Sequence, residues 1–306
     1  MQRGFKEYLI ISLKGLAMGA ADAVPGVSGG TIAFISGIYE ELISTISNIN
    51  PSLFKTLLTK GFKEFWKQLN GNFILALVSG IIISFISFMR LAKYLIENEP
   101  VLIWSFFFGL IIASIYFVGR QISTWNLQVF LGLTFGAVVA YFISTLPSMA
   151  TNESNVFLFF AGSLAICAMI LPGISGSFIL VVLGAYKTLS DAIHDFDIKK
   201  LLIFTSGAVI GLLSFSHLLK WLFKHYHNLT MAILTGFIFG SLNKVWPWKE
   251  TLTWHTNSKG LKTPLVEKSI LPFSYQGDNH LFTAILLMIL GFLTILFLEK
   301  IGSKQN

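Results

Sequence analysis

Long apolar runs are the feature of this sequence that most restricts its fold. A helix needs about 20 mostly apolar residues to cross a bilayer, and six stretches meet that requirement: residues 72–95, 100–119, 127–146, 200–223, 229–246 and 280–298. Only 12% of the 306 residues are charged, about half the usual share in a soluble domain, and the mean hydropathy is +0.71. These values exclude a soluble two-domain enzyme, a disordered chain and a disulfide scaffold, and they predict an all-α integral membrane protein.

Two further apolar regions, 6–47 and 156–189, are each interrupted by a short glycine-rich run. The interruptions read VPGVSGG at 24–30 and LPGISGS at 171–177. Proline and glycine break helices, and each half of an interrupted region is short for a full crossing. Each region is therefore predicted to be a re-entrant helical hairpin, which turns at mid-depth and leaves on the side where it entered. Below, residues 24–31 are called the first tip and residues 171–177 the second tip.

The two tips belong to an internal repeat, the first feature to seek in a long chain. Residues 24–40 align without gaps on 171–187, and residues 79–95 align on 206–222. The first alignment pairs Pro25, Gly26, Ser28, Gly29, Gly37 and Tyr39 with Pro172, Gly173, Ser175, Gly176, Gly184 and Tyr186. The second pairs Ser79, Gly80, Ser87, Phe88, Leu91, Lys93 and Leu95 with Ser206, Gly207, Ser214, Phe215, Leu218, Lys220 and Leu222, and it continues to Gly109 and Gly236.

One hairpin and three spans in each half give the two halves opposite orientations, which predicts an inverted-topology repeat of the kind found in secondary transporters. The first repeat is 1–150, with its hairpin at 6–47, an interfacial amphipathic helix at 51–69 and three spans. The second repeat is 151–306, with its hairpin at 156–189 and three spans. Hairpins that enter from opposite faces bring their tips together near the midplane. Close helix packing alone would also explain the glycines, but it requires no repeated Pro-Gly-x-Ser-Gly order.

The net charge and the cysteine content limit the kinds of ligand and partner that the chain can have. The net charge of +7 indicates contact with anionic membrane lipids and not with nucleic acid. The basic ends, with Arg3, Lys6, Lys300 and Lys304, favour cytoplasmic amino and carboxyl termini, and no cleavable signal peptide is expected. The single cysteine, Cys167, excludes an internal disulfide and a multi-cysteine metal site. We expect no metal and no cofactor, and the sequence indicates no oligomeric state.

Each tip has the chemistry of an anion site. A helix is expected to begin after each tip, at Thr31 and at about Phe178, and its first N–H groups lack helical partners and carry the positive end of the dipole. Glycines allow close approach, and serine and threonine hydroxyls add donors that suit a phosphate, although these hydroxyls can also serve only as helix caps. The candidate substrate-binding residues are Pro25, Gly26, Ser28, Gly29, Gly30 and Thr31 of the first tip and Pro172, Gly173, Ser175, Gly176 and Ser177 of the second.

Six ionisable residues at or near membrane depth are further candidates, because charge there is costly. Lys14 and Asp22 lie in the first half of the first hairpin, and Asp22 is expected either to pair with a basic residue or to bind a coupling proton or cation. Arg90 with His217, and Lys93 with Lys220, are pseudo-symmetric positions near span ends that could receive an anionic head group at each face. Snorkelling to the interface is the alternative for these four.

The motifs GLAMGAADAVPGVSGGTIAFISGIYEELI at 15–43 and MILPGISGSFILVVLGAY at 169–186 resemble the bacterial polyprenyl-phosphate transporter family, the PopT-type undecaprenyl-phosphate translocases. The resemblance covers the whole chain in layout and is most specific in these two motifs. It implies a non-enzymatic membrane lipid transporter that returns undecaprenyl phosphate from the outer to the inner leaflet of the bacterial cytoplasmic membrane for cell wall biogenesis. It also implies that Pro25 to Thr31 and Pro172 to Ser177 hold the phosphate head.

Three other functions compete with this one. Opposed broken helices with serine and glycine at their tips would also suit a small-anion channel or exchanger. Gly26 to Gly29 and Gly173 to Gly176 both match the G-x-S-G pattern of an intramembrane serine protease, but a nucleophilic serine needs an adjacent base, and only one span carries an evident histidine, His217. A lipid phosphatase lacks support, because no arginine and histidine cluster of that kind is present.

Overall fold

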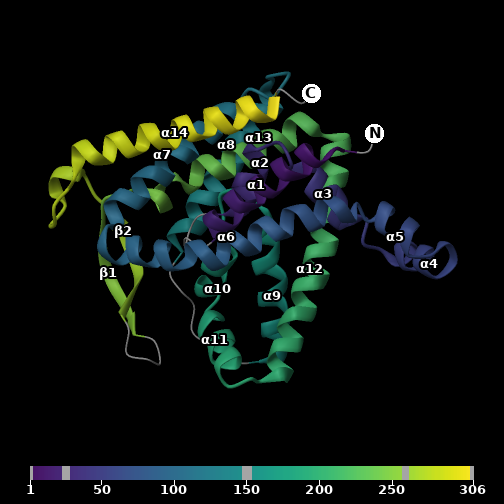
Figure 1. Ribbon diagram of the computed structural model, residues 1–306. Helices are drawn as coiled ribbons and strands as arrows, with labels where there is room; N and C mark the ends of the chain where they lie inside the picture. The colour runs from purple at the N-terminus through teal and green to yellow at the C-terminus, as the bar shows by residue number, and fades with distance from the viewer. Residues whose placement is uncertain (1–2, 23–27, 147–153, 257–261, 304–306) are drawn as a thin grey trace.

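The computed structural model describes residues 3–22, 28–146, 154–256 and 262–303, and most of them are helical (Figure 1). The first half contains α1 (Phe5–Asp22), α2 (Gly29–Ile35), α3 (Tyr39–Ser47), α4 (Pro51–Lys60), α5 (Phe62–Gln68), α6 (Gly71–Asn98), α7 (Pro100–Gly119) and α8 (Leu127–Thr145). The second half contains α9 (Asn155–Ile170), α10 (Gly176–Val182), α11 (Tyr186–His194), α12 (Ile198–His225), α13 (His227–Gly240), the 3-10 turn η1 (Ser241–Val245), β1 (Lys249–Thr256), β2 (Lys262–Ser269), the 3-10 turn η2 (Pro272–Ser274) and α14 (Leu281–Ser303).

All six predicted spans are helical, and four of these helices meet the length and composition of a membrane span among the described residues. These four are α6, α7, α8 and α12, and the pair α10 and α11 makes a fifth if a bend of 108° between the two is counted as one broken span. The span expected over 229–246 is shorter than predicted: α13 has 14 residues, about 21 Å, because the chain tightens into η1 after Gly240. The chain is thus a multi-pass, mainly helical membrane protein.

A helix begins after each tip, as the sequence predicted, but it is short and a second helix follows it. The break lies between α2 and α3 in the first half and between α10 and α11 in the second. Gly37 and Gly184 occupy the two breaks with φ of 73° and 69°, a left-handed conformation that glycine adopts without steric cost. The repeated glycine and the tyrosine two residues later therefore mark a turn and the start of a new helix.

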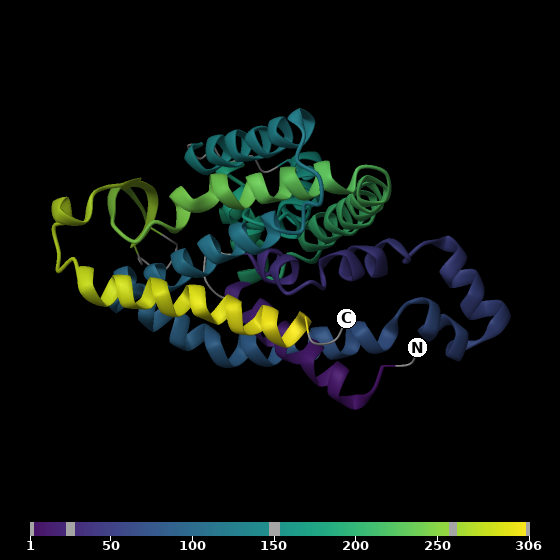
Figure 2. The same cartoon turned by 90° about the horizontal axis from the view of Figure 1, so that it is seen from above.

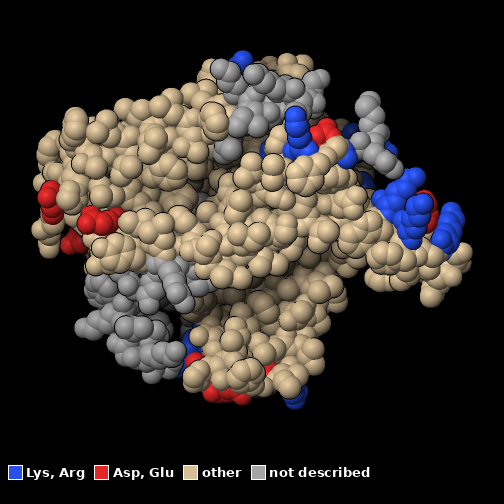
Figure 3. Space-filling view, in the orientation of Figure 1, with Lys and Arg blue, Asp and Glu red and all other residues tan. Residues whose placement is uncertain are grey.

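The predicted interfacial helix over 51–69 is also two helices, α4 and α5. The break lies at Gly61, whose φ is 82°, a backbone conformation that is strained for a residue with a side chain. Exposed Lys55, Lys60, Lys63 and Lys67 gather on this segment, which projects from one end of the molecule, while the loop before α14 lies at the other end (Figures 1, 2 and 3). A basic surface with apolar side chains beside it is typical of a segment that lies at a membrane interface.

Helices of the same half pair through glycines at equivalent positions. In the first half, α1 packs on α6, and a side chain at Gly80 would collide with the carbonyl oxygen of Ser12. In the second half, α9 packs on α12 in the same way, with Gly207 against the carbonyl oxygen of Phe159. The reverse contacts also match, since Gly15 abuts the carbonyl of Leu77 and Gly162 abuts that of Phe204. Backbones this close are typical of small-residue packing between membrane helices.

The two halves join through a second set of glycine contacts. Helix α7 packs on α14, where Gly109 lies against the backbone of Met288, and α8 packs on α13, where Gly236 lies against the backbone of Leu133. Helix α7 also contacts α13. These four helices therefore form one connected body to which each half contributes two members.

The polar loop 247–279, which sequence reasoning left unassigned, contains a two-stranded antiparallel ribbon. Lys249 of β1 lies opposite Ser269 of β2, and the register shifts on either side of Thr253. Buried Trp248 donates its indole N–H to the carbonyl of Asn279 at 2.8 Å, and Trp246 donates to the carbonyl of Ile270 at 2.8 Å. The ribbon is thus anchored at its base beside η1, at the end of α13.

Candidate functional site

The two tips contact each other inside the protein. The backbone N–H of Gly173 donates to Thr31 Oγ1 at 2.8 Å, and Ser28 Oγ donates to the carbonyl of Met169 at 3.3 Å. A side chain on Gly30 would lie 2.7 Å from the carbonyl oxygen of Ile170, so α2 begins directly against the end of α9. Pro25 and Gly26, which also belong to the predicted site, lie outside the described residues.

At the first tip, the chain's own groups already use the amides predicted to bind an anion. The N–H of Gly29 donates to Asp22 Oδ1 at 2.7 Å, the N–H of Gly30 donates to Ser28 Oγ at 3.1 Å, and the N–H of Thr31 donates to the carbonyl of Ser28 at 3.0 Å. Ser28 and Thr31 are buried. In this conformation the hydroxyls therefore act as caps and interhelical contacts, and a carboxylate occupies the start of α2.

The second tip is more open than the first. Ser175 is partly exposed and Ser177 is exposed, and their hydroxyl oxygens lie 2.9 Å apart in a hydrogen bond. Ser175 makes no side-chain cap to α10. Gly173, Ile174, Ser175 and Phe178 line a small hollow together with Ser144 of α8. The serine hydroxyls of the second tip are therefore more exposed than those of the first tip in this conformation.

Lys244 of η1 lines the same hollow, and the sequence-based site did not include it. Its Nζ lies 4.7 Å from the centroid of the Phe178 ring, within cation–π distance. Its carboxylate neighbour is Glu267 of β2, with Oε2 3.8 Å away. No local sequence pattern predicts a role for Lys244, because it reaches the second tip only through the packing of α13 and the ribbon.

Behind Lys244 lies a second lysine, Lys249. Its side chain is 7% exposed, its Nζ donates to the carbonyl of Lys244 at 2.7 Å, and it stands 4.0 Å from the centroid of the Trp104 ring. Glu267 Oε2 is 3.6 Å from this ammonium. Burial lowers the pKa of Lys249 to about 8, and Glu267 opposes that effect. One carboxylate therefore faces two ammonium groups.

An apolar groove lies beside the hollow. It has a volume of about 420 Å3 and is lined by Ala137, Val138 and Tyr141 of α8 with Phe239, Leu242 and Asn243. Helix α8 contributes to both spaces, through Ala140 and Ser144 on the hollow and through Ala137 and Tyr141 on the groove. A small hollow that contains one lysine and two serines thus adjoins an open apolar groove along the same helix.

The other predicted ionisable residues have separate partners. Lys14 Nζ donates to the carbonyl of Ser36 at 2.7 Å and so ties α1 to the end of α2. His217 is hydrogen-bonded through Nδ1 to the carbonyl of Leu213 of its own helix. Lys220 Nζ donates to Asn48 Oδ1 at 3.0 Å. The side chains of Arg90 and Lys93 lie outside the described set. Neither these three residues nor Asp22 lines the hollow.

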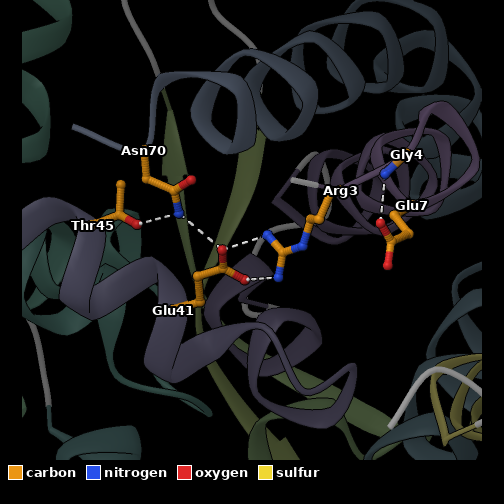
Figure 4. A network of polar contacts seen from close by, with 6 residues as sticks. All are labelled: Arg3, Gly4, Glu7, Glu41, Thr45 and Asn70. Atoms are coloured by element: carbon orange, nitrogen blue, oxygen red, sulfur yellow. Dashed lines mark hydrogen bonds and ion pairs between the residues drawn. The ribbon is translucent and has the colours of Figure 1, made fainter. Parts of the chain in front are cut away.

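Polar contacts hold α3 in place at its exposed end. Both guanidinium N–H groups of Arg3 donate hydrogen bonds to the Glu41 carboxylate, and Asn70 Nδ2 donates to Glu41 Oε1 at 2.9 Å and to Thr45 Oγ1 at 3.3 Å (Figure 4). Glu40 Oε1 lies 3.0 Å from Nε2 of His227. With the Lys220 contact to Asn48, these interactions connect α3 to the amino-terminal segment, to the start of α6 and to α12 and α13.

The two repeated tyrosines have opposite environments. Tyr39 is 2% exposed and packs edge-on against Phe223 of α12, with ring centroids 6.0 Å apart. Tyr186, its counterpart at the start of α11, is 49% exposed. Helix α3 therefore packs on the opposite half, whereas α11 leaves its tyrosine uncovered.

Broken helices that meet inside a bundle, beside a small hollow and an apolar groove, are typical of membrane transport proteins. A serine nucleophile requires an adjacent base, but within the described residues neither the Ser28 nor the Ser175 hydroxyl is hydrogen-bonded to a histidine or a carboxylate. The same residues contain no group of three or more histidine, cysteine, aspartate or glutamate side chains placed to hold a metal ion.

Sequence comparison specifies the family. Residues 18–263 match the family model described as undecaprenyl phosphate translocase-like, and the chain belongs to this family. It is 46% identical to a polyprenyl-phosphate transporter of Vibrio cholerae over 97% of this chain and 98% of that one. It is 29% identical to a polyprenyl-phosphate transporter of Staphylococcus aureus over 96% and 97% of the two chains. No solved structure matches the chain.

Proposed function

We propose that this protein moves undecaprenyl phosphate, or a similar polyprenyl phosphate, from the outer to the inner leaflet of the bacterial cytoplasmic membrane, so that the lipid carrier can be used again. Both curated relatives are named for polyprenyl phosphate, and they match nearly the whole chain. The observation that carries the proposal is the hollow at the second tip, where hydroxyls and a lysine meet inside an otherwise apolar bundle.

The phosphate head is proposed to bind at the tips, first at the second one. Ser175 and Ser177 offer hydroxyl donors, and the hydrogen bond between them can be exchanged for bonds to phosphate oxygens. The residues proposed to form this part of the site are Pro172, Gly173, Ser175, Gly176 and Ser177. The first tip, from Pro25 to Thr31, would join when movement of the halves exposes Ser28 and Thr31.

The polyprenyl tail is proposed to lie along the apolar groove between α8 and α13. A long hydrocarbon has no need of a closed cavity, because most of it can stay in the lipid while the head crosses. A bulky side chain at exposed Val138, in Val138→Trp, would fill this groove. We expect this variant to move long-chain polyprenyl phosphate more slowly and to bind a short-chain phosphate as the parent does.

The proposed transport cycle uses an inverted repeat with cytoplasmic termini. Two observations support it: matched glycine contacts in the pairs α1–α6 and α9–α12, and the unequal burial of the repeated Tyr39 and Tyr186. In the proposed cycle the side at α3 is closed in this conformation and the side at α11 is open. Exchange of these two states would carry the head group across.

A vesicle experiment tests this function. Purified protein is placed in liposomes that contain a polyprenyl phosphate, and a phosphatase that cannot cross the membrane is added outside. Without translocation, only the outer-leaflet lipid loses its phosphate; with it, hydrolysis proceeds beyond that pool. We expect the double variant Ser175→Ala and Ser177→Ala to slow this second phase strongly, and Ser206→Ala, at an exposed serine bonded to its own helix, to leave it unchanged.

The same vesicles separate lipid transport from ion conduction. Loaded with a chloride-sensitive dye, they report the flux of a small anion. Chloride flux without hydrolysis beyond the outer-leaflet pool would overturn the proposal in favour of an anion channel or exchanger.

A further inference from the structure

We propose that Lys244 is the cation that receives the phosphate head group, and that Glu267 of the ribbon is its counter-ion while no lipid is bound. This inference rests on the proposed function and adds to it a specific charge and a regulating carboxylate. Neither residue belongs to the tips, and neither has a counterpart in the repeat alignments.

Position is the first argument. Lys244 lies in the hollow with Gly173 and Ser175, and its ammonium stands over the Phe178 ring. Its side chain is 26% exposed, so it is accessible yet held within the recess. An ammonium over an aromatic face keeps part of its electrostatic stabilisation while leaving its N–H donors available. The hollow has a volume of only about 10 Å3, so it must widen before a phosphate can lie between this ammonium and the Ser175 hydroxyl and receive donors from both.

The counter-ion is the second argument. Glu267 Oε2 is 3.8 Å from Lys244 Nζ, longer than a hydrogen bond. The same oxygen lies 3.6 Å from Lys249, which is held by the backbone carbonyl of Lys244 and the Trp104 ring. Release of Lys244 would therefore leave Glu267 facing a lysine that is fixed in place. The carboxylate can give up one partner without becoming a buried unpaired charge, whose cost is high.

Contrast between the tips is the third argument. Asp22 places a carboxylate at the start of α2, and the aligned position in the second half is Met169. The first tip thus carries its own anion, whereas the second tip has a cation beside it. A phosphate would be repelled by Asp22 and attracted by Lys244. In this conformation the head group therefore has one favourable place.

Net charge gives the expected selectivity. Two ammonium groups and one carboxylate leave one positive charge at the hollow when Lys249 is protonated. A phosphorylated lipid compensates that charge, and the corresponding alcohol does not. Charged hydrogen bonds are stronger than neutral ones, so the site should separate a prenyl phosphate from a prenol.

Binding to the purified full-length protein tests the assignment, with farnesyl phosphate and farnesol as the probes and isothermal titration as the measurement. We expect Lys244→Met to weaken farnesyl phosphate binding by about tenfold or more, and Lys244→Arg to retain most of it. Glu267→Gln removes the competing carboxylate and should strengthen binding several-fold. In the double variant Lys244→Met and Glu267→Gln, that gain should disappear.

Two matched variants control for nonspecific effects. Lys199→Met removes an exposed lysine at the start of α12, and Glu250→Gln removes an exposed carboxylate on the same ribbon; both should bind as the parent does. Thermal melting identifies any variant that fails to fold, and Lys244→Arg and Glu267→Gln keep the test open if Lys244→Met is unstable. Unchanged farnesyl phosphate binding in folded Lys244→Met would overturn the inference, even if the parent moves lipid in vesicles. Loss of binding in Lys244→Met with no lipid movement by the parent would leave Lys244 as a phosphate ligand and refute the transport function.

Discussion

Similar residues at the two tips do different work, because their neighbours differ. Ser28 is buried and caps α2, whereas the hydroxyl of Ser175 borders the hollow and is hydrogen-bonded to that of Ser177. Asp22 supplies the first tip with a carboxylate that the second tip lacks. The equivalence visible in the alignment therefore does not extend to electrostatics, and each residue must be judged with its contacts.

Substitution of Asp22 separates a structural role from ion coupling. Asn retains an oxygen that can accept from the N–H of Gly29, so we expect Asp22→Asn to fold and to move lipid at a rate close to that of the parent. Asp22→Ala removes the acceptor and should cost about 1 kcal/mol of stability, the usual cost of a lost helix cap. Thermal melting and the vesicle assay measure the two effects. A well-folded but inactive Asp22→Asn would show that the carboxylate exchanges a proton or cation.

The buried lysine of the ribbon predicts a stability that depends on pH. Burial lowers the pKa of folded Lys249 from 10.5 to about 8. Between these values the unfolded chain binds the proton and the folded chain does not, so the contribution of Lys249 to stability rises with pH there and levels off below pH 8. The difference between the melting temperature of the parent and that of Lys249→Met should therefore rise as the pH is raised from 7.5 to 10.5. A flat difference would contradict the burial of a charged lysine.

The breaks at Gly37 and Gly184 are the elements that shape both halves. Each turns the chain after a seven-residue helix, and in the second half the bend between α10 and α11 is 108°. No atom lies within 4 Å of a methyl group placed on Gly37. Its requirement for glycine is therefore conformational and not steric.

Gly37→Ala isolates this backbone cost. We expect it to lower stability by about 1 to 2 kcal/mol, because a residue with a Cβ is strained in the left-handed region, and Gly37→Asn to lose less. Gly119→Ala is the matched control, since it also has open space around it but no positive φ. Equal melting temperatures for Gly37→Ala and the parent would contradict the assigned role.

Local sequence predicted the elements better than it predicted the site. The six spans are recognisable because an apolar run of membrane length has few alternatives, and the tips are recognisable because proline and glycine interrupt such runs. The interfacial helix expected over 51–69 is two helices, because the chain turns at Gly61. The helix expected to begin after each tip is short, because the chain turns at Gly37 and at Gly184. Lys244, Lys249 and Glu267 escaped notice because long-range packing, and no local spacing, brings them to the second tip.

At the scale of the whole molecule, the two halves share the same glycine contacts between helices, but their repeated tyrosines are buried to different extents. Tyr39 is covered by Phe223 of the other half, and the polar contacts of Glu40 and Glu41 surround that seam. Tyr186 has no such cover. The repeat alignments give Ile96 as the counterpart of Phe223, so the complementary state is expected to bring Tyr186 to the end of α6.

Paired cysteines test this exchange in a background with Cys167→Ala. A disulfide between Tyr39→Cys and Phe223→Cys should form readily and stop lipid movement until it is reduced. The pair Tyr186→Cys and Ile96→Cys should cross-link slowly, and faster when polyprenyl phosphate is supplied, because it requires the complementary state. Each single cysteine variant, which should move lipid under both redox conditions, is the control. Full transport with the first disulfide intact would rule out movement at this seam.

The matched glycine contacts also decide which parts can move. Helices whose backbones touch have no side chains between them that could change rotamer and let one slide past the other. In the proposed cycle, the pairs α1–α6 and α9–α12 would therefore travel as stiff units, each carrying its tip, against the body formed by α7, α8, α13 and α14. Engineered cross-links inside a pair should be harmless, whereas cross-links from a pair to this body should stop the protein in one state.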